Sequence, residues 1–77
     1  MKRAGEVDVH LTHREHEVLV LVGEGLSSKQ VAQRLDIAPK TVEGYVDRVR
    51  LRLGATNRCH MISLAISKGL IGPDSGG

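Results

Sequence analysis

Charged side chains between residues 40 and 52 could do the chemistry that a polyanion requires. Lys40, Arg48 and Arg52 could neutralise phosphates, since basic side chains supply much of the affinity for nucleic acid. Glu43 and Asp47 could accept from the N4 amine of cytosine, or Glu43 could orient Arg48 or Lys40 through an ion pair. On an exposed face such a pair contributes about 0–1 kcal/mol, so its role would be geometric. The alternative is an ordinary solvated surface.

The charge distribution along the chain favours a polyanion partner more than the net charge does. The formal net charge is only +2. Residues 26–58, however, hold seven basic and three acidic residues, whereas residues 1–25 hold three basic and five acidic ones. A basic middle on a small domain indicates binding to a polyanion such as nucleic acid.

The sequence contains no residue pattern typical of a catalytic site or a metal site. His10, His13 and His16 recur every three residues, but the first precedes the helix start, so we expect solvated histidines and no metal site. No nucleophile, base and orienting group share a recognisable spacing, and no glycine loop could cradle a phosphate. Cys59 is the only cysteine and cannot form an internal disulfide. We therefore predict no enzyme activity, no cofactor and no small-molecule ligand.

The length and composition predict one small domain. Seventy-seven residues can bury one modest core, which must be aliphatic because Tyr45 is the only aromatic residue. No apolar run approaches the ~20 residues that span a membrane, and no signal-peptide pattern follows Met1. We expect a cytoplasmic protein without a membrane partner.

Two short helices are predicted in the first half of the chain. Thr12 and Glu15 form a capping box at the first helix start, and Gly25 ends that helix. Ser27 and Gln30 form a second capping box. The apolar stripes of the two helices are Val18, Leu19 and Val22, and Val31, Ala32 and Leu35.

A longer third helix is predicted from Pro39 to Leu53, after a turn that contains Asp36. Ala38 is a poor cap for this helix. Its buried stripe is Val42, Val46, Val49 and Leu53. The opposite side carries Lys40, Glu43, Gly44, Asp47 and Leu51, with Thr41, Arg48 and Arg52 along one edge.

A fourth helix is predicted over residues 57–68, capped by Asn57 and ended by Gly69. One face is the apolar stripe Met61, Ile62, Ala65 and Ile66; a second, small-residue face holds Cys59, Ser63, Leu64 and Ser67. An apolar residue among small neighbours favours a packing surface. Residues 1–10 are predicted to be a flexible lead, residues 11–71 the domain, and residues 72–77 a disordered tail.

Four short helices without strand signals indicate an all-α, compact four-helix domain that contains a helix-turn-helix. Its motifs resemble the LuxR-type (GerE-like) helix-turn-helix family at Leu11–Glu15, Gly25–Ala32, Lys40–Tyr45 and Arg52–Arg58. The resemblance extends over roughly residues 11–71 and combines several motifs at fixed spacing.

The resemblance implies a transcriptional regulator that binds a two-fold symmetric DNA site as a dimer, with the third helix in the major groove. It implies a helix-turn-helix unit at residues 26–45 and dimerisation through the face of Cys59, Ser63, Leu64 and Ser67. Glu15 and Arg58 match structural positions, which suggests a pair between the first and fourth helices. The positions that match DNA contacts are Lys29, Lys40 and Thr41 at phosphates or the groove edge, and Glu43, Gly44, Asp47 and Arg48 at bases or the nearby backbone; given the motif, Arg52 joins them.

The chain departs from the family pattern at four positions. Glu43 stands where some members carry a DNA-contacting lysine, and Tyr45 replaces the commoner histidine. His13 replaces a proline and Ala38 a serine. Gly44 is either tolerated by the scaffold or lets the helix axis approach the bases.

The sequence also allows two alternatives to the LuxR-type interpretation. The first is a sigma-factor region-4-like domain, which the additional fourth helix disfavours. The second is a protein-interaction module whose helix-turn-helix surface binds a regulator or RNA polymerase.

Overall fold

The computed structural model describes residues 10–72, which form four helices and no strand. These are α1 (His13–Gly23), α2 (Ser28–Leu35), α3 (Pro39–Leu53) and α4 (Arg58–Ser67). The predicted all-α architecture is confirmed. The lead predicted for residues 1–10 and the tail predicted for residues 72–77 lie, apart from His10 and Gly72, outside the described residues.

The helix starts follow from side chains that bond to the first free backbone N–H groups. In α1 the N–H of Glu15 donates to Thr12 Oγ1 (3.1 Å) and the N–H of Thr12 donates to Glu15 Oε1 (3.0 Å), which is the predicted capping box. Ser27 and Gln30 repeat it in α2, with distances of 3.2 and 2.8 Å. The N–H of His60 donates to Asn57 Oδ1 (2.9 Å) at the start of α4. Only α3 begins without a side-chain cap, as expected from Ala38.

Left-handed residues end α1 and α2 and so set the angles of the turns. Gly25 has φ +97°, which glycine adopts without a steric penalty. After Gly25, the N–H of Leu26 donates a hydrogen bond to the carbonyl oxygen of Leu21 (3.2 Å). Asp36 ends α2 at φ 58°, the only described non-glycine residue with positive φ. Aspartate tolerates this conformation better than most residues, so the turn into α3 can be tight.

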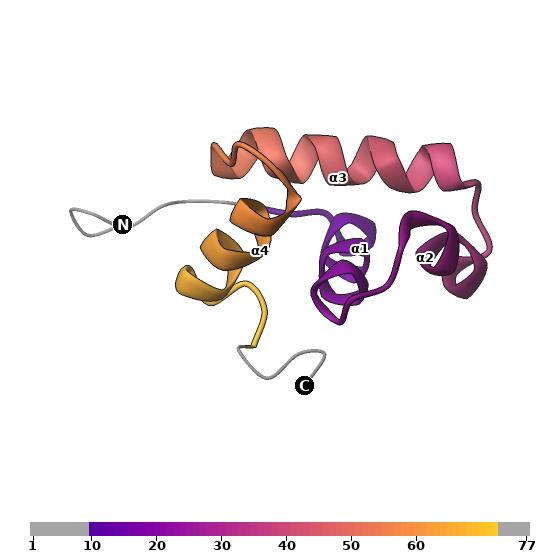
Figure 1. The fold of residues 1–77 in the computed structure, drawn as a ribbon, viewed down its shortest axis with the longest axis horizontal. Coiled ribbons are helices and arrows are strands. Elements are labelled where there is room, and N and C mark those ends of the chain that lie inside the picture. Colours follow the sequence, from indigo (N-terminus) through magenta and orange to yellow (C-terminus); the bar gives the residue numbers. More distant parts are fainter. Residues whose placement is uncertain (1–9, 73–77) are drawn as a thin grey trace.

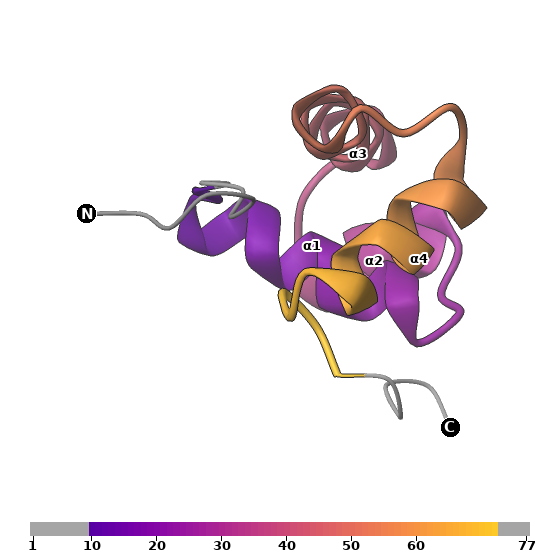
Figure 2. The same ribbon diagram turned by 90° about the vertical axis from the view of Figure 1, so that its left-hand side faces the viewer.

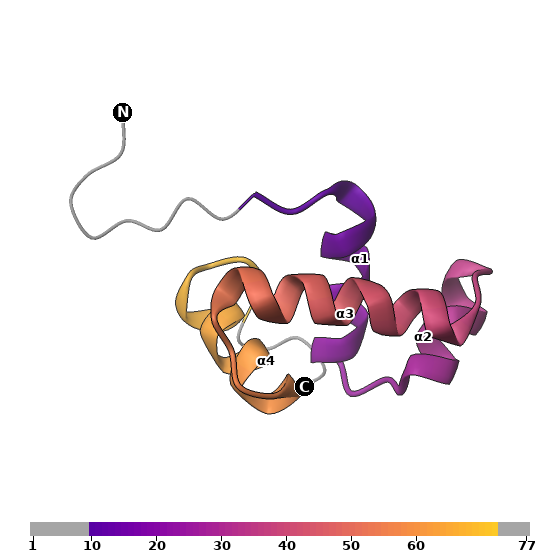
Figure 3. The same ribbon diagram turned by 90° about the horizontal axis from the view of Figure 1, so that it is seen from above.

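Helix α3 lies across a layer formed by the other three helices. Figures 1 and 3 show α1 beneath the middle of α3, α2 beneath its N-terminal part and α4 beneath its C-terminal end. Seen nearly end-on in Figure 2, α3 stands above the rest of the domain. It packs against all three other helices and leaves its far side uncovered.

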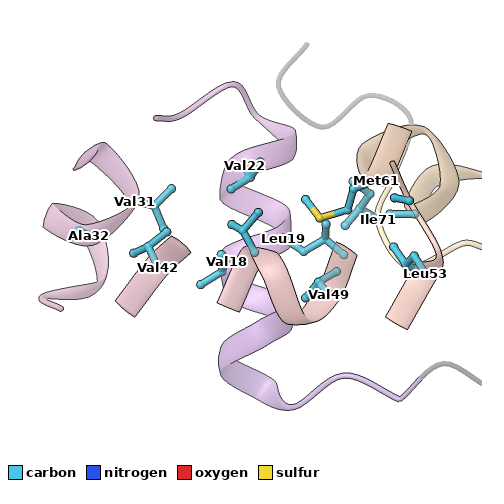
Figure 4. Close-up of a cluster of buried hydrophobic side chains, with 13 residues drawn as sticks. Val18, Leu19, Val22, Val31, Ala32, Val42, Val49, Leu53, Met61 and Ile71 are labelled. Carbon is cyan, nitrogen blue, oxygen red and sulfur yellow. The ribbon is translucent and has the colours of Figure 1, made fainter. Parts of the chain in front are cut away.

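The core occupies the space between α3 and this layer (Figure 4). All four residues of the predicted α3 stripe are buried. Most of the other predicted core residues are buried as well, but Leu35, Ile62 and Ile66 are only half-buried. Ala55 and Ile71 belong to the core although no periodic pattern predicted them.

The segment after α4 folds back onto α1. The Nε2–H of His16 donates to the carbonyl oxygen of Leu70 (3.0 Å), and Ile71 is buried. A Cβ atom on Gly23 would lie 3.0 Å from Ile71 Cδ1, which is closer than ordinary van der Waals contact. Gly23 therefore gives Ile71 room against α1.

Candidate nucleic-acid interface

The outer face of α3 holds most of the predicted contact residues. Its four buried apolar residues fix the rotation of the helix, so the remaining positions turn away from the core. Exposed on this side are Lys40, Thr41, Glu43, Asp47, Arg48, Leu51 and Arg52, and Gly44 is half-buried. Lys29 is exposed in the first turn of α2. The structure thus brings the predicted residues of α3 onto one uncovered surface.

Gly44 has no packing reason to be glycine. A Cβ atom built there would meet no atom within 4 Å outside the helix itself. Glycine in the interior of a helix is about 1 kcal/mol less favourable than alanine. The absence of a steric requirement supports the hypothesis that the missing side chain matters to a bound partner.

The two acids of this face differ in their surroundings. Asp47 Oδ1 lies 4.0 Å from Arg50 Nε, and Arg50 Nη1 also donates to the carbonyl oxygen of Ala55 (3.2 Å). Glu43 forms no ion pair or hydrogen bond within residues 10–72, so the structure does not support the hypothesis that it orients Arg48 or Lys40. Its carboxylate is exposed and accessible to a donor from outside.

The Arg48 guanidinium lies over the ring of Tyr45, with its central carbon 5.2 Å from the ring centroid. Tyr45 is half-buried and packs against the core, whereas Arg48 is exposed. The distance is that of a cation–π contact. The i, i+3 spacing of the two residues is visible in the sequence, but no pattern in the sequence predicted the contact.

Arg52 is anchored to the N-terminal end of α1. Its Nη1 donates to Glu15 Oε1 (2.5 Å) and to the carbonyl oxygen of His10 (3.0 Å). Glu15 is 2% exposed, while the Arg52 side chain is 42% exposed. Part of the Arg52 side chain is therefore still exposed to solvent, but its Nη1 atom is already hydrogen-bonded within the domain.

The pKa of Glu15 is lowered from its ordinary value by its hydrogen-bond partners. Burial alone would raise this pKa, since it disfavours the charged carboxylate. The backbone N–H of Thr12, the hydrogen bond and charge of Arg52 and the Thr12 hydroxyl outweigh that effect. Glu15 is thus a buried carboxylate that stays ionised.

The predicted pair between Glu15 and Arg58 is wrong. Arg52 occupies the carboxylate, and Arg58 Nη2 instead donates to Ser28 Oγ (3.0 Å), joining the start of α4 to the start of α2. The physical reason is that α3 crosses over α1 (Figure 3), so that the long Arg52 side chain, near the end of α3, reaches the carboxylate in the first turn of α1. The spacing of residues along the chain does not encode this crossing.

The predicted dimerisation residues lie on the outer side of α4. Cys59, Ser63 and Ser67 are exposed, and Leu64 is half-buried with part of its side chain against the core. Met61 and Ala65 take the opposite, buried side. A face of small side chains thus remains uncovered by the rest of the domain.

Metal-binding clusters and membrane-spanning helices are both absent from residues 10–72. No three His, Cys, Asp or Glu side chains there are grouped closely enough to hold a metal ion. None of the four helices has the length and apolar composition to cross a membrane.

Comparison with known proteins shows the same arrangement elsewhere. The family described as bacterial regulatory proteins, luxR family, matches residues 9–65. The transcriptional activator protein SolR of Ralstonia solanacearum is 42% identical over 66 residues, which are 86% of this chain and 28% of SolR. The chain thus spans less than a third of the length of SolR.

Solved structures share the fold. VqmA of Vibrio cholerae, in a complex with ligand and DNA, superposes with a TM-score of 0.79 at 37% identity, covering 84% of this chain and 29% of that one. The transcription factor GerE superposes with a TM-score of 0.78 at 30% identity, covering 83% of this chain and 96% of GerE. Each of these similarities thus covers more than four fifths of this chain.

Proposed function

Because the chain belongs to the luxR family of bacterial regulatory proteins, which are transcriptional regulators and not enzymes, we propose that it binds a two-fold symmetric DNA site as a homodimer. Helix α3 enters the major groove of each half-site. Lys29, Lys40 and Thr41 contact the backbone at the groove edge, and Glu43, Gly44, Asp47 and Arg48 face the bases. The observation that carries the proposal is the outer face of α3, which bears all of these groups except Lys29 of α2 and which no other helix covers (Figure 1).

The comparisons support the DNA-binding part of this proposal. VqmA carries a domain of the same fold, and its structure was solved with DNA. The family match extends to residue 65 and so includes most of α4, which favours the LuxR type over the sigma-factor alternative.

Dimerisation is proposed through α4. Its outer side presents Cys59, Ser63 and Ser67, with part of Leu64. Small side chains allow two helices to approach closely, and a two-fold axis through such a face sets the same patch of both copies against each other. Half-sites would then lie about 10 base pairs apart, or a multiple of this distance.

Selection from random duplex DNA, repeated at two salt concentrations, tests the proposal. We expect an enriched two-fold symmetric consensus. If Lys29 and Lys40 of both copies neutralise phosphates, the logarithm of the binding constant falls with the logarithm of salt at a slope of about −4. Selection that enriches no sequence would overturn the proposal.

A matched pair of variants tests the phosphate contacts. Lys40→Gln should weaken binding to all sequences alike and reduce the salt slope by about 1 for each copy. Lys68→Gln removes the same charge from the C-terminal end of α4, away from α3, and serves as the control. Equal effects of the two variants would show that charge alone, not the α3 surface, binds DNA.

A further inference from the structure

Tyr45 and Arg48 form the only cation–π contact among the described residues, and it lies on the edge of the proposed DNA-binding face. Tyr45 is held from below, because its half-buried ring packs against the core. Arg48 is exposed above it. A fixed ring thus supports the face of a guanidinium that would otherwise sample many rotamers.

The surroundings leave the edge of this guanidinium available. Arg48 has no hydrogen bond or ion pair within residues 10–72, since the nearby Asp47 lies toward Arg50 and Glu43 has no partner there. Because the ring contacts one side of the guanidinium, the N–H donors along the guanidinium edge stay available to a partner. Those donors match the O6 and N7 acceptors of guanine in the major groove.

We infer that Tyr45 is a positioning residue that presents Arg48 to a guanine edge in the major groove. The inference rests on the proposed function and goes beyond it in assigning a role in specificity to a residue that does not itself contact DNA. Holding Arg48 in its bound geometry before association reduces the side-chain entropy lost on binding. The cation–π contact therefore increases the preference for one base pair in each half-site.

The contact can be observed before any DNA is added. In the free protein, the Cδ protons of Arg48 should show an upfield ring-current shift in the NMR spectrum. The shift should persist in Tyr45→Phe, which keeps the aromatic face, and disappear in Tyr45→Leu. Unshifted Arg48 protons in the natural chain would overturn the inference.

The DNA test uses the full 77-residue chain and the duplex found by selection, with the preferred guanine either kept or replaced. Tyr45→Leu should lower the affinity for the guanine duplex about 2- to 5-fold, as expected for loss of an exposed cation–π contact, and change the affinity for the replaced duplex less than 2-fold. Arg48→Met should abolish the preference, which we expect to be about 10-fold. The double variant should be no weaker than Arg48→Met alone.

Controls separate this role from a structural one. Tyr45→Phe keeps the aromatic ring and should keep the preference for the guanine duplex. Arg34→Met, which removes a charge from α2, should also leave this preference unchanged. If Tyr45→Leu does not fold, Tyr45→Met keeps the apolar volume and takes its place.

The inference is overturned if Tyr45→Leu (or Tyr45→Met in its place) keeps the full preference for the guanine duplex. It is also overturned if Arg48→Met weakens binding to both duplexes equally, as loss of a phosphate contact would. A chain that selects no sequence at all overturns the proposed function and this inference with it. A sequence-specific chain whose preference is independent of Tyr45 overturns this inference alone.

Discussion

The buried carboxylate of Glu15 and its partner Arg52 allow a quantitative test of what holds α3 on α1. Glu15→Gln removes the charge but keeps an oxygen that can accept from Thr12. A hydrogen bond to a charged group contributes about 1.5–3 kcal/mol. Because Arg52 is 42% exposed and solvent screens its charge, we expect the lower half of that range, about 1.5–2 kcal/mol.

The matching variant Arg52→Met should cost more than Glu15→Gln. It leaves a carboxylate that is 2% exposed without its cation. Breaking a fully buried pair in this way costs about 3–5 kcal/mol, and the 42% exposure of Arg52 lowers the expected cost to about 2–4 kcal/mol. The double variant Glu15→Gln/Arg52→Met should be no less stable than Arg52→Met alone. The coupling free energy between the two residues should therefore be at least the cost of Glu15→Gln, about 1.5–2 kcal/mol.

Urea unfolding followed by circular dichroism measures these values, and each kcal/mol corresponds to about 4–8 °C in Tm for a domain of this size. Matched variants at an exposed pair, Arg14→Met and Glu17→Gln, control for the general loss of charge; their atoms lie 3.4 Å apart on the surface of α1. A Glu15–Arg52 coupling below about 0.5 kcal/mol, within the additivity error, would refute the reasoning.

The pH dependence of stability follows from the sign of the Glu15 shift. The pKa of Glu15 is lower in the folded than in the unfolded protein, where it is about 4.3. Its contribution is therefore complete above that pH and is lost as the pH falls through the folded value. The stability difference between the natural chain and Glu15→Gln should thus be constant from pH 7 to 5 and shrink below pH 4. A difference that is unchanged at pH 3 would contradict this assignment.

Three further predictions concern the interface and its support. Gly44→Ala should raise the free energy of unfolding by about 1 kcal/mol and weaken binding to the selected duplex; unchanged binding would exclude a close approach at this position. Ala38→Ser should stabilise the chain by about 0.5–1 kcal/mol, because Ala38 already has the extended backbone of a cap residue, with φ −74° and ψ 144°; unchanged urea unfolding would contradict this. Ser63→Arg should leave unfolding unchanged but reduce binding of a full site to that of a half-site, as measured by sedimentation and titration, whereas Gln33→Arg on α2 should not.

Features that depend on neighbouring residues were predictable from the sequence. The capping boxes of Thr12 and Ser27 need only a residue three positions on, and the valine stripe of α3 needs only the helical period. The boxes predicted where α1 and α2 start, and the stripe predicted the side of α3 on which the candidate DNA contacts lie. Dimerisation and the individual DNA contacts stay predictions.

Features that depend on how helices cross could not be predicted in this way. Arg52 reaches Glu15 across 37 positions, so no local pattern predicted this ion pair, and Glu15 was paired with Arg58 instead. Ile71 follows the last helix and has no periodic pattern to mark it as buried. Leu35, Ile62 and Ile66 lie at the margins of the layer, where a helical stripe is wider than the surface that covers it.

The contact between Gly23 and Ile71 has a consequence for the order in which the chain can fold during synthesis. Helix α1 is made early, yet one of the side chains that cover it belongs to a residue 48 positions later. Until Ile71 leaves the ribosome, this part of α1 faces water and the nascent chain lacks a closing contact of its core. We therefore expect stable folding only after release of nearly all of residues 10–72, as a single late step and not helix by helix.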